Sequence, residues 1–141
     1  MKIFLATRDP LFRMGMRLVL SQAQDVDFIG EASESLTAIE EIDTLEPEVA
    51  LLDDDMSGLT AIETIRILRQ QSPALKIILF SNFGYHDHLN RIFAAGADGC
   101  VIKNVANGEL MNIIRSIYEG RSIESPFLIG SASYSEAKMQ I

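Results

Sequence analysis

The chain has little cysteine, few basic side chains and no long hydrophobic run. Its single cysteine, Cys100, has no partner in the chain for a disulfide, which favours a reducing cytoplasm. Twelve Lys and Arg stand against twenty Asp and Glu, a formal net charge of −8, so the surface repels phosphate backbones and anionic membranes. No apolar run approaches membrane-spanning length. We therefore expect a cytoplasmic protein that by itself binds neither DNA nor a membrane.

Several enzyme signatures are also absent. The sequence contains neither Gly-x-Gly-x-x-Gly nor Gly-Lys-Ser/Thr, the motifs whose backbone cradles phosphates. It has no nucleophile elbow and no histidine placed as a general base. A fold alone does not establish a function, so a flavodoxin-like ligand-binding protein or enzyme stays as the least favoured alternative. We expect that the protein is not an enzyme.

What the sequence does contain is an alternation of short apolar runs with helical patterns. At 141 residues with 48% hydrophobic content, the chain suffices for one domain with a sizeable core. The alternation predicts an α/β fold, a doubly wound five-stranded parallel sheet with five helices, as in flavodoxin-like proteins. The expected strands are 3–6, 28–32, 48–53, 75–80 and 99–102, and the expected helices are 11–23, 35–45, 59–71, 88–95 and 107–118.

The run before Asp53 is the most informative stretch. The four residues that precede Asp53 carry no polar side chain, which is typical of a strand buried on both faces of a parallel sheet. An acid at the carboxyl end of such a strand lies where open α/β sheets place their ligands. Asp53 is therefore the first candidate site residue, with Asp54 and Asp55 as its neighbours in the following loop.

Polar side chains also follow other strands that reach this edge of the sheet. A carboxylate can attack a phosphorus centre to give an acyl phosphate. An ammonium group and a hydroxyl can then hold the phosphoryl oxygens. The set therefore suits a phosphoryl acceptor. Its members besides the acids are Thr7, Arg8 and Asp9 after the first strand, Ser81 after the fourth and Lys103 after the fifth.

Residues 2–120 resemble the receiver domains of two-component response regulators. Asp53, with Met56 and Gly58 after it, is similar to the phosphoacceptor strand and loop of that family. The resemblance implies that Ser81 is the switch Ser/Thr. Residues 95–99, followed by Lys103, resemble the signature of the family's fifth strand, whose lysine contacts the phosphoryl group.

Residues 9–13 and Ser125-Pro126 resemble the NarL/FixJ branch of the family, which carries a C-terminal helix-turn-helix domain. The resemblance implies a receiver domain over 1–120 and a linker or tail over 121–141, leading toward an output domain absent from this chain. It implies a histidine kinase or other regulatory protein as partner, and DNA binding only through such an output domain. It also suggests a homodimer through the helices 88–95 and 107–118.

The sequence departs from the family at the magnesium site. Two acids usually follow the first strand and hold Mg2+ together with the phosphoacceptor, but here Thr7 and Arg8 replace them. Magnesium prefers carboxylates and water, so a hydroxyl and a guanidinium remove most of its attraction. Asp9 lies one position too late. Cys100 replaces the aromatic residue of the family's switch.

We therefore expect an atypical receiver, with no metal, that does not depend on Mg2+-assisted phosphorylation and controls an output such as transcription. Arg8 would pair with Asp53 or Asp55 and stand in for the charge of the metal. The alternative is a conventional receiver that a histidine kinase phosphorylates on Asp53, with Asp54 or Asp55 recruiting a weakly held Mg2+.

Overall fold

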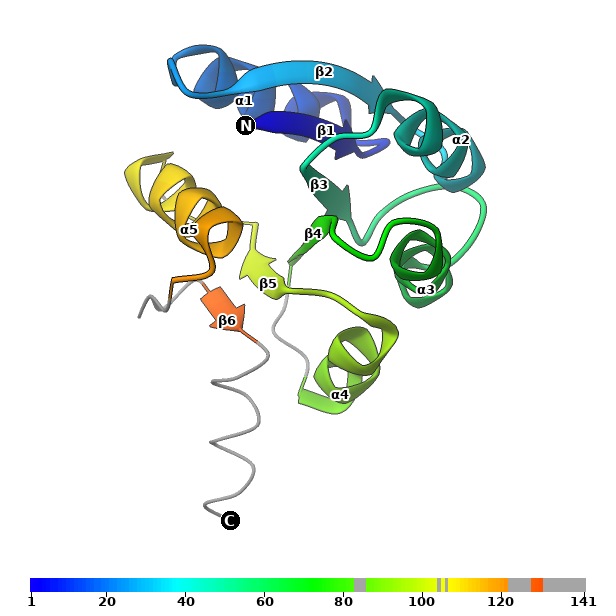
Figure 1. The fold of residues 1–141 in the computed structure, drawn as a ribbon. Helices are drawn as coiled ribbons and strands as arrows, with labels where there is room; N and C mark the ends of the chain where they lie inside the picture. Colours follow the sequence, from blue (N-terminus) through cyan, green and yellow to red (C-terminus); the bar gives the residue numbers. More distant parts are fainter. Residues whose placement is uncertain (83–85, 104, 106, 122–127, 131–141) are drawn as a thin grey trace.

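One six-stranded sheet with helices on both faces makes up the fold (Figure 1). The computed structural model describes residues 1–82, 86–103, 105, 107–121 and 128–130, with the backbone alone at 86–88, 107 and 128–130. The strands are β1 (Lys2–Ala6), β2 (Asp27–Ala32), β3 (Val49–Asp53), β4 (Lys76–Ser81), β5 (Gly99–Ile102) and β6 (Leu128–Gly130). The helices are α1 (Pro10–Ser21), α2 (Ser35–Leu45), α3 (Ala61–Gln71), α4 (His86–Ala95) and α5 (Asn107–Glu119).

The strand order is β2-β1-β3-β4-β5-β6, and the first five strands are all parallel. Five parallel strands with five helices confirm the predicted doubly wound fold. The structure adds β6, which pairs antiparallel with β5 and lies inside the segment 121–141 that we expected to be a linker or tail. The five-stranded prediction therefore omitted the edge strand of this sheet.

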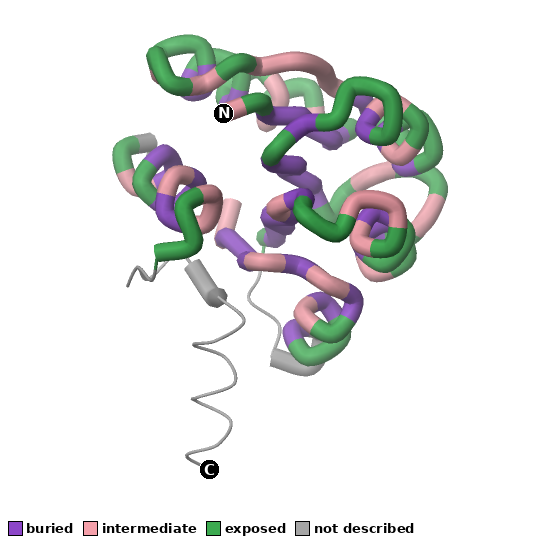
Figure 2. The backbone as a smooth tube through the Cα atoms, in the orientation of Figure 1, coloured by how far each residue is buried: buried purple, intermediate pink, exposed green. Residues whose placement is uncertain are grey.

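Two apolar layers cover the sheet, and β1, β3, β4 and β5 between them are almost wholly buried, whereas the edge strand β2 is mostly half-buried (Figure 2). All five residues of β3 are buried, as expected for a strand enclosed on both faces. The layer under α2, α3 and α4 and the layer under α1 and α5 are separate clusters. Their helix residues include Ile42, Ile65, Leu68, Leu89 and Ile92 on the first side, and Met16, Leu20, Leu110, Ile113 and Ile114 on the second.

The spacing of apolar residues in α1 predicts a helix, and the structure has a helix there. The apolar side chains that carry this spacing nevertheless face solvent. Leu11, Met14 and Leu18 recur at helical period, yet they are among the most exposed large hydrophobic side chains in the described part of the chain. A second stripe, which includes Met16 and Leu20, faces the sheet instead. Both stripes fit the 3.6-residue period, so periodicity finds the helix without deciding which face is buried.

The candidate site lies beyond the carboxyl ends of β1 and β3, which are neighbours in the sheet. The connection from β1 runs to β2 on one side, and β3 joins on the other, so the topology reverses between β1 and β3. Open α/β sheets bind ligands in the crevice at such a point, beyond the carboxyl ends of the strands. Ala6 is paired in register with Leu52, which brings Thr7 and Asp53 to neighbouring positions there.

Arg69 fastens the C-terminal end of α3 to the turn after α4. Its guanidinium donates to the carbonyl oxygen of Gly96 and to Asp98 Oδ2 at 2.8 Å. It also donates to the carbonyl oxygen of Leu75 at 2.7 Å. Gly96 has a φ of +122°, and a Cβ there would come within 2.7 Å of the Arg69 side chain, so this turn requires glycine. The positions of α3 and α4 are thereby coupled.

Candidate functional site

The carboxylate of Asp53 lies fully buried at the end of β3 and is held from three directions. Thr7 Oγ1 donates to Asp53 Oδ2 at 2.6 Å. Lys103 Nζ lies 2.8 Å from Oδ2 and 2.7 Å from Oδ1, and the amide of Asp55 donates to Oδ1 at 3.0 Å. Burying a carboxylate is costly unless it is paired and hydrogen-bonded, and here each oxygen has both kinds of partner.

The aromatic ring of Phe12 completes the surroundings of Lys103. Lys103 Nζ lies 4.8 Å from the centroid of the Phe12 ring, within the range of a cation–π interaction. The same ring packs edge-on against Phe80, with centroids 5.4 Å apart. Sequence reasoning did not assign Phe12 to the site. The one available signal was its place in the first turn of the helix after β1, next to the polar strand ends.

At the rim of the site, Arg8 contacts Asp55. Arg8 Nε donates to Asp55 Oδ1 at 2.8 Å, so of the two acids considered as partners for Arg8 the structure selects Asp55. The side chains are 56% and 52% exposed, respectively, so water and salt screen this pair. Arg8 thus places a positive charge beside the loop acids. The positive charge that contacts Asp53 directly comes from Lys103.

Asp9 does not enter the site, because its side chain caps α1. Its Oδ1 accepts from the backbone amides of Leu11 and Phe12 at 3.0 and 3.3 Å. These bonds satisfy two of the free amides at the start of a helix. The amide of Asp9 in turn donates to Thr7 Oγ1 at 3.1 Å. This contact orients the Thr7 hydroxyl so that its proton points to Asp53.

Ser81 and Cys100 lie on the α3–α4 side of the same edge. The backbone carbonyl of Ser81 accepts from the amide of Lys103 at 2.9 Å, which fixes the loop that carries the lysine. Burial, together with the nearby charge of Asp54, raises the pKa of the Cys100 thiol to about 11. Cys100 is therefore a neutral, apolar side chain at physiological pH.

The residues at this edge do not suit a magnesium ion. Asp55 already carries the guanidinium of Arg8, and Asp53 carries the ammonium of Lys103 and the hydroxyl of Thr7. A dication would have to displace or face these cations, whereas Mg2+ needs carboxylates and water in octahedral array. Among the described residues, no group of three or more His, Cys, Asp and Glu side chains is arranged to hold a metal.

The partner surface expected from the sequence is only partly exposed. On α4, Leu89 and Ile92 belong to the core and Phe93 is half-buried, whereas Asn90 and Arg91 lie on the surface. Of these three apolar side chains, only Phe93 leaves part of its surface accessible to a partner. A homodimer through 88–95 and 107–118 remains a prediction.

Comparison with known proteins identifies the family of the chain. Residues 3–115 match the model of the response regulator receiver domain. The chain belongs to this family. It is 30% identical over 126 residues to the nitrate/nitrite response regulator protein NarL of Escherichia coli (strain K12), covering 89% of this chain and 58% of NarL. It is 28% identical over 135 residues to the transcriptional regulatory protein DesR of Bacillus subtilis (strain 168), covering 96% of this chain and 66% of DesR.

Solved receiver structures resemble this chain closely. The receiver domain of the putative response regulator NarL from Mycobacterium tuberculosis superposes with a TM-score of 0.80 at 27% identity, covering 85% of this chain and 97% of that one. A LuxR-family response regulator from Aurantimonas superposes with a TM-score of 0.84 at 26% identity, covering 98% and 97%.

The relatives are response regulators, which act in two-component signalling and in the control of transcription. The chain spans about three fifths of the length of the curated relatives it matches (58% of NarL, 66% of DesR). Within the described part of the chain, no helix combines the length and apolar character needed to cross a membrane.

Proposed function

We propose that this receiver domain signals without Mg2+-assisted phosphorylation of Asp53. The observation that carries the proposal is the pair of contacts at the family's acidic positions: Arg8 binds Asp55, and Thr7 donates to Asp53. Phosphoryl transfer depends on charge neutralisation and positioning, which a metal normally supplies. A guanidinium at this position neutralises charge but coordinates neither the phosphoryl oxygens nor water as a metal does.

The buried contacts of Asp53 support a pocket that is held in a single conformation without a phosphoryl group. Asp53 has both oxygens engaged, so a nucleophilic attack on phosphorus would first have to weaken a contact with Thr7, with Lys103 or with the amide of Asp55. The receiver would then respond to a protein or a small ligand, and its output, such as transcription, would lie in a further domain. A histidine kinase or another regulatory protein would be the partner, and DNA would be contacted only through that further domain.

A conventional phosphoreceiver is the second candidate, because Asp53, Ser81 and Lys103 do meet at one edge. Acetyl phosphate with Mg2+, followed by mass spectrometry of intact protein, separates the two. We expect no added phosphoryl mass on the wild type and partial labelling of Arg8→Asp, which restores an acid at this position. Arg121→Asp makes the same charge change at an exposed site just after the C-terminal end of α5 and should stay unlabelled.

Magnesium-dependent labelling of the wild type on Asp53, abolished in Asp53→Asn, would overturn the proposal and establish the conventional mechanism. Labelling of Arg121→Asp to the same extent as Arg8→Asp would show that net charge alone controls the reaction, which also contradicts the assigned role of Arg8.

A further inference from the structure

A cavity of about 420 Å³ lies between α3, α4, the carboxyl end of β4 and Cys100 of β5, beside the Asp53 site. Apolar side chains line much of it: Ile62 from α3, Leu89 and Ile92 from α4, and Cys100 from β5. Pockets of about 300–1,000 Å³ with apolar walls and a few polar groups are typical of small-molecule sites. The size and the lining therefore fit a small organic ligand.

The cavity depends on the small side chain at position 100. Cys100 is buried, and its raised pKa of about 11 keeps the thiol neutral. Because Cys100 lines the cavity, a bulky side chain in its place would project into the open volume. The two helices that flank the cavity are coupled to each other, since Arg69 joins the C-terminal end of α3 to the turn after α4.

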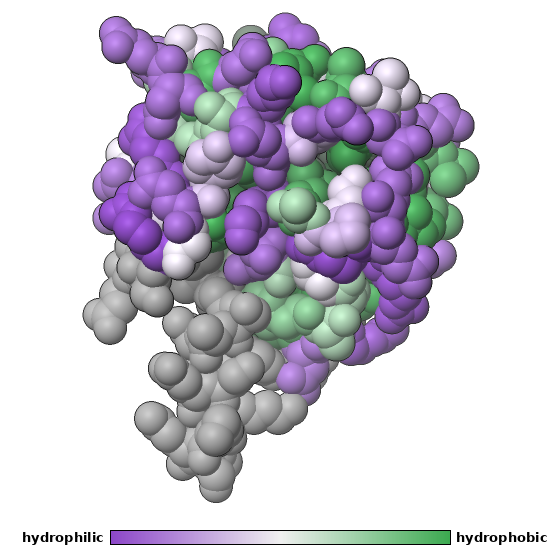
Figure 3. Space-filling view, in the orientation of Figure 1, coloured by the Kyte–Doolittle hydropathy of each residue, from purple (hydrophilic) through white to green (hydrophobic). Residues whose placement is uncertain are grey.

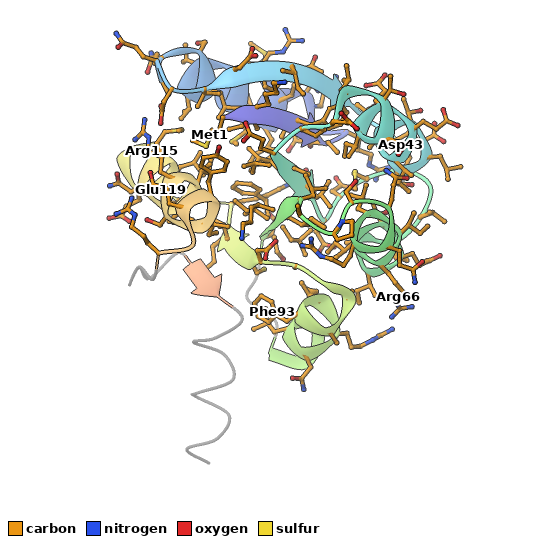
Figure 4. The ribbon with its side chains drawn as sticks, in the orientation of Figure 1. Met1, Asp43, Arg66, Phe93, Arg115 and Glu119 are labelled. Carbon is orange, nitrogen blue, oxygen red and sulfur yellow. The ribbon has the colours of Figure 1, made fainter. Side chains whose placement is uncertain are left out.

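The arginines around the cavity differ from every other arginine in the chain. The sequence holds eight arginines, and Arg66 on α3 and Arg91 on α4 both line this cavity. Both side chains belong to exposed residues, and Figure 4 shows Arg66 on the side of α3 that faces α4. Among the described residues, neither guanidinium forms a salt bridge or a hydrogen bond. The remaining six all form salt bridges: Arg8, Arg13, Arg17, Arg69, Arg115 and Arg121.

Two unpaired guanidiniums at one cavity are notable in a chain of net charge −8. Guanidiniums bind carboxylates through paired hydrogen bonds, so the two arginines are suited to one shared anion. The acid nearest to them on α3, Glu63, is already engaged in a capping box with Thr60, whose Oγ1 lies 2.8 Å from Glu63 Oε1. Asp54 also lines the cavity, but among the described residues neither Asp54 nor Glu63 forms a salt bridge with Arg66 or Arg91.

We propose that this cavity binds a small organic carboxylate with an apolar body. The carboxylate lies between Arg66 and Arg91, and the apolar body covers Ile62, Ile92 and Cys100. In Figure 3, hydrophobic side chains over the α4 region border hydrophilic ones, the pattern that such an amphipathic ligand needs. The inference goes beyond the proposed function, since it holds whether or not Asp53 accepts a phosphoryl group.

The test uses 4-phenylbutyrate as the probe and 4-phenylbutan-1-ol as its neutral analogue, each titrated into 15N-labelled protein. We expect saturable amide shifts with 4-phenylbutyrate, clustered at the cavity residues of α3, α4 and β5, and at least about tenfold weaker binding of the alcohol, the loss of one charged contact. Arg66→Gln with Arg91→Gln should weaken the carboxylate by at least the same factor and leave the alcohol unchanged. Arg121→Gln, an exposed arginine away from the cavity, is the matched control.

Cys100→Phe should abolish binding of both probes by filling the cavity, while Cys100→Ala should retain it. Circular dichroism checks that Cys100→Phe is folded, and the arginine variants decide the test if it is not. Absence of saturable shifts at millimolar probe would overturn the proposal. Equal affinity for the carboxylate and the alcohol would also overturn the proposal. So would a loss of carboxylate affinity in Arg121→Gln that equals the loss in the double variant. None of these outcomes bears on Asp53 labelling, so this proposal and the proposed function fail separately.

Discussion

The site contains two ion pairs: a buried pair of Lys103 and Asp53, which we call the floor, and an exposed pair of Arg8 and Asp55, which we call the rim. Both join a cation to a carboxylate, but their surroundings differ. At the floor, Lys103 meets Asp53, whose side chain is 0% exposed, and the lysine side chain is 13% exposed. At the rim, Arg8 meets Asp55 at the same kind of distance, but more than half of each side chain faces solvent. A buried pair that loses one partner leaves an uncompensated charge, whereas an exposed pair exchanges its contact for water. The floor should therefore control stability, and the rim should control access of a metal.

The largest effect is expected for Lys103→Met, which keeps the aliphatic stem and removes the ammonium. Asp53 then stays buried with only Thr7 and one backbone amide as partners, so the free energy of unfolding should fall by about 3 kcal/mol. Urea denaturation at pH 7 measures the change. A loss no larger than that of the rim variant Arg8→Gln would contradict the distinction between floor and rim.

A smaller loss is expected for Thr7→Val, which has the same shape but no hydroxyl. The variant removes the donor to Asp53 and the acceptor for the amide of Asp9. Because one of these bonds involves a charged group, unfolding should become easier by about 2 kcal/mol in the same denaturation experiment. Thr44→Val, on the exposed surface of α2, is the matched control and should change little.

A double-mutant cycle measures whether the contacts to Asp53 act together. Thr7→Val and Lys103→Met act on the same carboxylate, so their effects should couple by about 1 kcal/mol or more. Arg8→Gln and Lys103→Met share no partner and should add. Additive effects of Thr7→Val and Lys103→Met, together with coupling between Arg8→Gln and Lys103→Met, would contradict the division into floor and rim.

The smallest effect on stability is expected for Arg8→Gln. Exposed ion pairs contribute less than about 1 kcal/mol, so the free energy of unfolding should scarcely change. Raising the salt concentration should shrink the difference between wild type and variant further, because salt screens exposed charges. A loss as large as that of Lys103→Met, insensitive to salt, would show that Arg8 acts as part of the floor.

The elements, and the polar residues grouped at the strand ends, could be predicted from the sequence because their signals are local. The apolar run that ends at Asp53 and the alternation of strands and helices depend on neighbouring residues alone. The parallel topology then brings Thr7, Asp53, Ser81 and Lys103 to one edge.

What the sequence missed depends on tertiary placement. Two apolar stripes of α1 share one period, so only packing decides that Leu11, Met14 and Leu18 face outward. Phe12 joins the site because the first turn of α1 places its ring under Lys103. The strand β6 is three residues long and forms its hydrogen bonds with β5. Three residues are too few for a sequence periodicity to predict a strand.

Whether Arg8 takes the place of the metal is measured by a magnesium titration of the 15N-labelled wild type, Arg8→Asp and Arg121→Asp. We expect no saturable Mg2+-dependent shift at the amides around Asp53 in the wild type or in Arg121→Asp, and saturable shifts there in Arg8→Asp. Saturable Mg2+ binding by the wild type at Asp53 would contradict this expectation, because Arg8 would then not occupy the place of the metal.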